Sequence, residues 1–250
     1  QFYKADELCE EGHPDYELFK SLEFSIEQWK TIFAKARSFD LKIYADVFGE
    51  DSFSEAKELD VDGYKIHSAD LDNINLISKI ATLGKTLLLG VGGRKRVEIY
   101  STVKYLKENF DNLEIILMVG HQTFPTPVSE HNLNEINWFC RAYRDLDVKV
   151  GVADHIDGDL PVAKIWPLTA LGAGACIVEK HITIDRKLKL EDYESAIDVA
   201  DFKNITPSDA KKMLINTADE TAKTISTFGK KVLTEHIPTS THQVKPVEKE

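Results

Sequence analysis

Short apolar runs alternate with segments of helical periodicity along most of this chain. A short apolar run bounded by turn residues is typical of a buried strand, whereas apolar residues at every third or fourth position indicate an amphipathic helix. A helical pattern separates each run from the next, so strand–helix units repeat through the sequence. The six runs that we expect to contain strands are 41–48, 63–70, 85–93, 114–122, 149–155 and 176–182.

Repeated strand–helix units predict a parallel sheet covered by helices, and two α/β architectures satisfy that pattern. An open doubly wound sheet would carry a GxGxxG fingerprint after its first strand and gather polar residues at one switch point. The sequence has no such fingerprint, and polar residues follow nearly every apolar run. We therefore predict a (β/α)8 barrel of the TIM type, with about six of its eight βα units in this chain. The first two strands are expected to precede Gln1.

The barrel is predicted to extend over residues 1–229. Its last helix is expected to begin at Thr206, where a capping residue is followed by a proline and an acid, and to stop at Gly229. Residues 230–250 lack an apolar period and are expected to form a polar tail.

Composition limits the class of protein. At 250 residues, with 42% hydrophobic and 29% charged residues, the chain is long enough for one large α/β domain. A formal net charge of −11 argues against nucleic acid and an anionic membrane as partners, because both require a basic surface. The three cysteines include no CxxC pair, and no apolar stretch reaches the roughly 18 residues of a membrane span. These features predict a protein of the reducing cytoplasm.

The carboxyl ends of the strands meet on one face of a β/α barrel, and the active site forms there. We expect the following polar residues to converge at that face: Asp46, Lys65, Ser68, Asp70, His121, Asp154, His155, Glu179, Lys180 and His181. Lys65 lies inside a predicted strand, where an ammonium group is costly unless it meets an anion. Because side chains alternate along a strand, Glu179 and His181 should face the interior and Lys180 the other side.

The sequence resembles the sialic acid synthase family in five segments: GYKIHSADLDN, LLLGVGG, FPTP, VGVADHIDGD and, above all, IVEKHITIDR. The similarity extends from Gln1, where the family has the glutamine that ends its second strand, to about Phe202. It implies condensation of phosphoenolpyruvate with N-acetylmannosamine or a related amino sugar, giving a nine-carbon 2-keto sugar acid and phosphate. It also implies a divalent metal, Mn²⁺ or Mg²⁺, that polarises the sugar aldehyde, and a homodimer.

The resemblance assigns roles to individual residues. His155 corresponds to one of the family's two metal-binding histidines and Val119 to the other, so we expect His121, two residues further along the same strand face, to complete the metal site. Asp154 is expected to orient His155. Substrate contacts are expected from Gln1, Lys65, Ser68, Asn73, Gly92, Lys180 and Arg186. Catalytic roles are expected from Glu179, His181, Asp154 and Asp70.

Besides Val119, three positions depart from the family pattern. Asp46 stands where a threonine that donates to phosphate is common, Gly90 where a serine is common, and Tyr193 where a histidine is commoner. A carboxylate at position 46 would repel a phosphate dianion unless it is paired. Two other functions therefore stay open: a metal-dependent aldolase acting on a keto-sugar acid, and a non-catalytic barrel that binds a sugar. Asn73 also fits a helix N-cap, and Arg186 a surface salt bridge.

Overall fold

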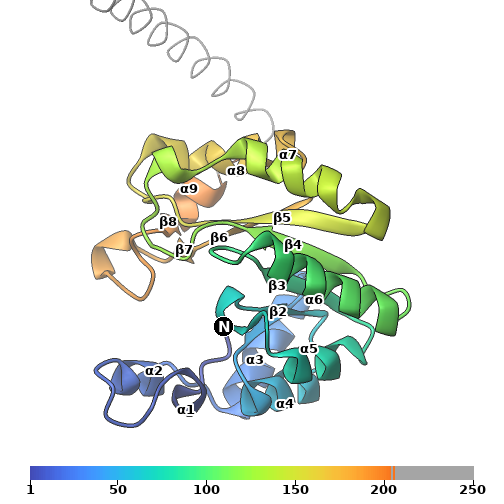
Figure 1. Ribbon diagram of the computed structural model, residues 1–250. Helices are drawn as coiled ribbons and strands as arrows, with labels where there is room; N and C mark the ends of the chain where they lie inside the picture. The colour runs from blue at the N-terminus through green and yellow to red at the C-terminus, as the bar shows by residue number, and fades with distance from the viewer. Residues whose placement is uncertain (204, 206–250) are drawn as a thin grey trace, which may run out of the picture. The chain divides into compact units, whose positions relative to one another are not determined.

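A computed structural model describes residues 1–203 and 205, so the helix predicted to begin at Thr206 and the tail predicted over 230–250 lie outside the described residues. Six parallel strands form one sheet in sequence order (Figure 1). They are β1 (Tyr44–Val47), β2 (Gly63–Ile66), β3 (Thr86–Gly90), β4 (Ile115–Val119), β5 (Val148–Asp154) and β6 (Ile177–Lys180). Each of the six predicted runs contains or overlaps one of these strands, which confirms the predicted parallel α/β architecture.

Helices precede the sheet, connect its strands and cover its outer face (Figure 1). Before the sheet lie α1 (Ala5–Leu8), α2 (Tyr16–Ser21) and α3 (Ile26–Arg37); between strands lie α4 (Glu50–Glu58), α5 (Ile74–Ala81), α6 (Arg96–Asn109), α7 (Leu133–Ala142) and α8 (Trp166–Gly172). After β6 follow β7 (Ile182–Thr183), β8 (Ile197–Asp198) and α9 (Val199–Lys203), with β7 and β8 paired in parallel. Within residues 1–203 and 205, none of the helices combines the length and the apolar character of a membrane span.

Alternation along the strands separates two hydrophobic layers. In β4, Leu117 and Val119 point outward and join the main core, which the buried faces of the connecting helices complete. Met118, between them, points inward and packs with Leu88 of β3 and Ile177 of β6 in a small inner cluster. Both faces of the central strands are therefore apolar, and this explains why their sequences read as continuous apolar runs.

The sheet is curved so strongly that its first and last strands share a contact. In a flat sheet, five strand spacings of about 4.8 Å would separate β1 from β6 by about 24 Å. Instead, Lys65 of β2 donates hydrogen bonds to Asp46 of β1 and to Glu179 of β6, at 3.0 and 2.8 Å. The six strands therefore wrap around an interior, as the strands of a β/α barrel do.

Two glycines allow the carboxyl ends of the strands to pack closely. A Cβ atom at Gly90 would lie 2.8 Å from the backbone nitrogen of Ser68, in the 3₁₀ turn η1 (Ser68–Asp70) that follows β2. A Cβ atom at Gly92 would lie 1.9 Å from the carbonyl oxygen of Gly120. Gly90 and Gly92 of the LLLGVGG segment are thus required by the approach of neighbouring backbone, independently of any ligand.

Candidate active site

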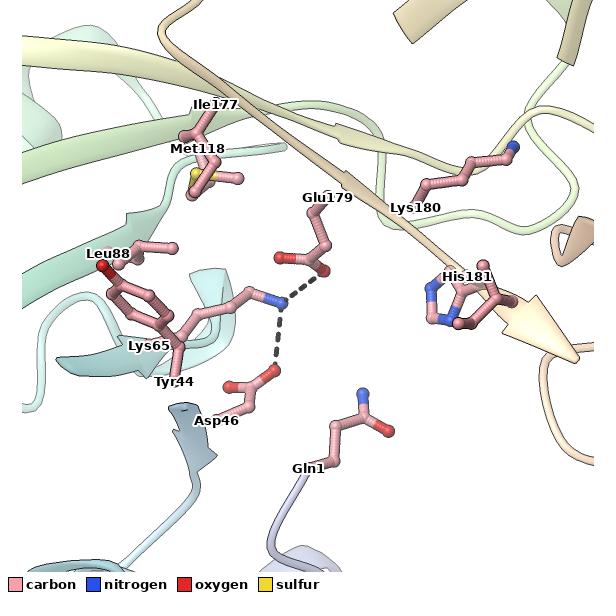
Figure 2. A pocket seen from close by; sticks show the side chains of 11 residues that line it. Gln1, Tyr44, Asp46, Lys65, Leu88, Met118, Ile177, Glu179, Lys180 and His181 are labelled. Carbon is pink, nitrogen blue, oxygen red and sulfur yellow. Dashed lines mark hydrogen bonds and ion pairs between the residues drawn. The ribbon is translucent and has the colours of Figure 1, made fainter. Parts of the chain in front are cut away.

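A cavity of about 430 Å³ opens inside the curve of the sheet (Figure 2). Its volume falls within the range of small-molecule sites, roughly 300–1,000 Å³. Its walls combine apolar side chains of the inner cluster with polar residues at the carboxyl ends of the strands; they include Tyr44, Leu88, Met118, Ile177, Gln1, Asp46, Lys65, Glu179 and His181. A smaller cavity of about 90 Å³ shares Gln1, Lys65, Glu179 and His181 with it and adds Ser68, Gly90, His155 and Asp192.

Lys65, Asp46 and Glu179 form a buried ionic group that we call the Lys65 clasp (Figure 2). The side chains of Lys65 and Asp46 are only 14% and 6% exposed, and that of Glu179 is 29% exposed. Burial by itself would lower the pKa of Lys65, but the two carboxylates outweigh it and hold that pKa above its ordinary value. Burial would likewise raise the pKa of Glu179, but the Lys65 ammonium outweighs it and holds that pKa low. Lys65 is therefore a permanent cation, unsuited to Schiff-base chemistry, which needs a neutral amine.

Two imidazoles stand beside the clasp on the smaller cavity. The ring centroids of His155 and His181 lie 5.1 Å apart, and Nδ1 of His181 lies 3.5 Å from a carboxylate oxygen of Asp192. Nδ1 of His155 is buried and has no hydrogen-bond partner among the described residues. Burial, and then the neighbouring His181, lowers the pKa of His155. His155 is therefore neutral at neutral pH and available as a proton acceptor.

The described residues do not assemble the expected metal site. His121 lies in a separate depression, where its Nε2 is 2.9 Å from the carbonyl oxygen of Glu130 and its ring faces His131. It shares that depression with Val119, whereas His155 lines the smaller cavity. Among residues 1–203 and 205, no three histidine, cysteine or acidic side chains form a group that could hold a metal ion. The expected pair of His121 and His155 is therefore not assembled, and we derive no step through a metal.

Asp154 and Lys180 form a second buried ion pair, directed away from the cavity. Their charged atoms are 3.1 Å apart, and the two side chains are 0% and 4% exposed. Asp154 also accepts a hydrogen bond from the backbone N–H of Ile156 at 2.9 Å, so it does not orient His155 as expected. Lys180 borders the cavity, but its ammonium points outward (Figure 2). Burial raises the pKa of Asp154 and lowers that of Lys180, which marks a pair held at a large desolvation cost.

Some of the residues expected to contact substrate line the two cavities, and others do not. Gln1, Lys65 and Ser68 line the cavities as expected, and Ser68 is buried there. Asn73 instead caps α5, since its Oδ1 accepts the backbone N–H of Leu76 at 3.2 Å. Asp70 lies in η1, outside the lining of both cavities, where burial raises its pKa. Gly92 packs against backbone and is also outside that lining.

The guanidinium of Arg186 holds two loops together. It donates to Asp159 at 3.1 Å through Nε, and its Nη1 donates to the carbonyl oxygens of Tyr193 and Ala196. It also donates to the carbonyl oxygen of Glu194 and forms an ion pair with Asp157, and the side chain is 12% exposed. The salt-bridge interpretation of Arg186 therefore describes the structure better than a contact with substrate.

Sequence reasoning missed part of the cavity wall. Leu88 was not expected there, yet it lies in one row with the expected Asp46 and Lys65, because β1 pairs Asp46 with Lys65 and β2 pairs Lys65 with Leu88. Counting alternate residues back from the strand ends could have identified Leu88 and Met118 as inward-facing. Asp192 comes from the segment between β7 and β8, and no periodic pattern in the sequence indicates that it reaches the smaller cavity.

Comparison with known proteins identifies a family. A family model described as the NeuB family matches residues 1–217. The uncharacterized protein MJ1065 of Methanocaldococcus jannaschii is 31% identical over 214 residues, covering 82% of this chain and 58% of that protein. Pseudaminic acid synthase of Campylobacter jejuni is 27% identical over 188 residues, covering 75% of this chain and 52% of that enzyme. The chain thus spans a little over half the length of these relatives.

Among solved structures, the N-acetylneuraminic acid (sialic acid) synthetase of Leptospira borgpetersenii, crystallised with citrate, superposes with a TM-score of 0.70. The alignment covers 86% of this chain and 78% of that one, at 23% identity. At this identity the likeness shows the fold alone. It agrees with the barrel-type curvature of the sheet, for which the contacts of the Lys65 clasp are the evidence.

Proposed function

Because this chain belongs to the NeuB family, we propose that it condenses phosphoenolpyruvate with an N-acylated amino sugar. The product would be a nine-carbon 2-keto sugar acid, with release of phosphate. The relatives act, by their names, toward different sugar acids, pseudaminic acid in one case and N-acetylneuraminic acid in another. The proposal therefore names N-acetylmannosamine or a relative as the class of sugar and leaves its substituents open.

The observation that carries this proposal is the Lys65 ammonium inside the cavity. It is a permanent cation, 14% exposed, set above an apolar floor that includes Leu88 and Met118. A carboxylate or phosphate is the ligand that such a cation attracts, and apolar side chains suit the carbon skeleton attached to it. Phosphoenolpyruvate carries both kinds of anion on three carbons, which supports its assignment to this cavity.

The condensation also requires proton transfers. The methylene carbon of phosphoenolpyruvate bonds to the aldehyde carbon, whose oxygen takes up a proton. Water adds to the central carbon of the enolpyruvate, which loses phosphate and a proton to give the ketone. We assign these transfers to His155 and His181, the two imidazoles on the smaller cavity, and we assign Glu179 to holding Lys65. The metal, the homodimer and the cytoplasmic location stay predictions.

An activity assay tests the proposal. The full chain is incubated with phosphoenolpyruvate and a panel of N-acylated amino sugars, with and without Mn²⁺, and released phosphate and 2-keto acid are measured together. We expect stoichiometric formation of both with at least one sugar. Lys65→Met should abolish the reaction, whereas Lys79→Met, which removes an exposed lysine paired with Glu50, should not. No release of phosphate with any sugar under either condition would refute the proposal.

The pairing of Lys65 with two carboxylates also supports the two alternative functions, the aldolase and the non-catalytic sugar-binding barrel. The two negative charges lower the affinity of the cavity for a phosphate dianion. The same assay separates them. Pyruvate released from a nine-carbon keto acid without any need for phosphate would identify an aldolase. Sugar binding without turnover would identify a non-catalytic barrel.

A further inference from the structure

Asp46 is buried, but only one of its two carboxylate oxygens has a hydrogen-bond partner among the described residues. Its side chain is 6% exposed, and one carboxylate oxygen, Oδ2, accepts from Lys65 at 3.0 Å. The other oxygen, Oδ1, is shielded from solvent and has no hydrogen-bond partner among the described residues. An unsatisfied buried acceptor is destabilising, and the large majority of buried polar side-chain atoms are hydrogen-bonded. Asp46 therefore calls for a functional explanation.

The charges of the Lys65 clasp provide a functional explanation for the burial of Asp46. A single ammonium faces two carboxylates, so the group carries a formal charge of −1, and Asp192 adds another acid on the smaller cavity. Any anion that binds Lys65 must approach both carboxylates. Glu179 has a longer side chain and is 29% exposed, so it can swing away from Lys65. Asp46 is short, buried and fixed on a strand, so its charge stays beside the bound anion.

We propose that Asp46 is a specificity-determining residue, which competes with the anionic substrate for Lys65 and makes the cavity discriminate against dianions in favour of monoanions. This inference rests on the proposed function, since it concerns the same cavity. Coulomb repulsion scales with the charge of the ligand, so Asp46 weakens the binding of a phosphate dianion twice as much, in free energy, as that of a monoanionic carboxylate. The ligand thus contacts Lys65 with its carboxylate, or the phosphate product dissociates readily from the cavity.

The test is direct binding by isothermal titration calorimetry at pH 8.5, with inorganic phosphate as the dianion and pyruvate as the monoanion. The full chain is compared with Asp46→Asn, which removes the charge with little change of shape. We expect pyruvate binding to tighten about fivefold and phosphate binding by about the square of that factor, roughly 25-fold. Asp60→Asn is the matched control, because Asp60 pairs with Lys85 and its side chain is 86% exposed. It should change neither affinity.

Two further variants make the result decisive. Adding Lys65→Met to Asp46→Asn should abolish the gain for both anions, since the ammonium is the group that binds them. Asp46→Thr, with a thermal unfolding scan of every variant, provides a second uncharged side chain in case Asp46→Asn folds poorly. Unchanged phosphate affinity in both uncharged variants, an equal gain for both anions, or a gain that survives loss of Lys65 would each overturn the inference. None of these outcomes depends on turnover, so they are distinct from a failure of the proposed reaction, which would appear as absent phosphate release by the unaltered chain.

Discussion

Replacement of Lys65 by methionine tests the structural role of the Lys65 clasp. Methionine preserves much of the aliphatic stem but removes the ammonium that donates hydrogen bonds to both Asp46 and Glu179. The variant therefore keeps two carboxylates close to each other inside the sheet, one of them 6% exposed, without a counter-charge. Their repulsion acts between β1 and β6, the strands that the clasp brings together, so the curvature of the sheet should become less stable.

The magnitude follows from burial. Breaking a buried ion pair by removing one partner costs about 3–5 kcal/mol. Glu179 is 29% exposed and can regain part of its hydration, so the lower end, about 3 kcal/mol, is expected. For a domain of this size, about 1 kcal/mol shifts the melting temperature by roughly 2–4 °C, which gives a decrease of about 6–12 °C.

Urea and thermal unfolding followed by circular dichroism measure this effect. The triple variant with Lys65→Met, Asp46→Asn and Glu179→Gln should regain most of the lost stability, since no charge is then left unpaired. Lys79→Met should change the free energy of unfolding by less than about 0.5 kcal/mol, because its ion pair with Glu50 is more than half exposed. A loss below about 1 kcal/mol in Lys65→Met, or a triple variant as unstable as the single one, would show that buried charge is not the cause.

The contribution of the clasp should also depend on pH. The pKa of Glu179 is held below its ordinary 4.5, so its stabilising contribution is present above about pH 4.5 and is lost as the pH falls through its folded-state pKa. The pKa of Lys65 is held above its ordinary 10.5, so its contribution is complete below that pH and is lost only at higher pH. The stability difference between the unaltered chain and Lys65→Met should therefore be largest between neutral pH and about pH 10, and it should shrink in acid as the unpaired carboxylates of the variant become protonated. A difference that grows below pH 4 would contradict the assigned pairing.

Three further substitutions test other parts of the fold. Lys180→Met leaves Asp154 buried without its counter-charge and should lower the free energy of unfolding, measured by urea titration, by about 3–5 kcal/mol. Adding Asp154→Asn should restore most of that stability. If it does not, the loss comes from altered packing rather than from the unpaired charge. Gly92→Ala places a Cβ 1.9 Å from a carbonyl oxygen and should lower the free energy of unfolding by about 1–3 kcal/mol. Gly172→Ala, whose Cβ would have nothing within 4 Å, should leave it nearly unchanged. Equal effects of the two substitutions would contradict the steric explanation. Arg186→Ala should speed hydrogen exchange in the loops that the guanidinium holds while β4 keeps its protection, and uniform exchange changes would indicate global destabilisation instead.

The strands and the faces of their side chains could be predicted because both are local properties. The apolar run at 114–122 contains β4, and the alternation expected at the end of β6 is observed, with Glu179 in the Lys65 clasp and Lys180 paired with Asp154 on the other side. The helix N-cap that Asn73 fits by position is also present. In each case neighbouring residues along the chain decide the outcome.

The positions of ligand-like side chains at the strand ends could not be predicted in the same way. His121 follows a glycine with a φ of +156°, and the segment beyond it turns to Glu130 and His131. Arg186 finds its acceptors among loop carbonyl oxygens, which carry no sequence pattern. The path of a loop depends on what packs against it, so residue type and spacing were insufficient at these sites.

Local sequence pattern predicts the order of the elements and the side of each strand on which a residue lies, because alternation and helical period follow from backbone geometry. Which of those residues meet depends on the folding of all the strands together. Lys65 and Glu179 are separated by 114 residues, and their contact exists because the sheet curves until β1 and β6 approach the same ammonium. Curvature is the sum of twist and packing over all six strands, so no single segment of the chain encodes it.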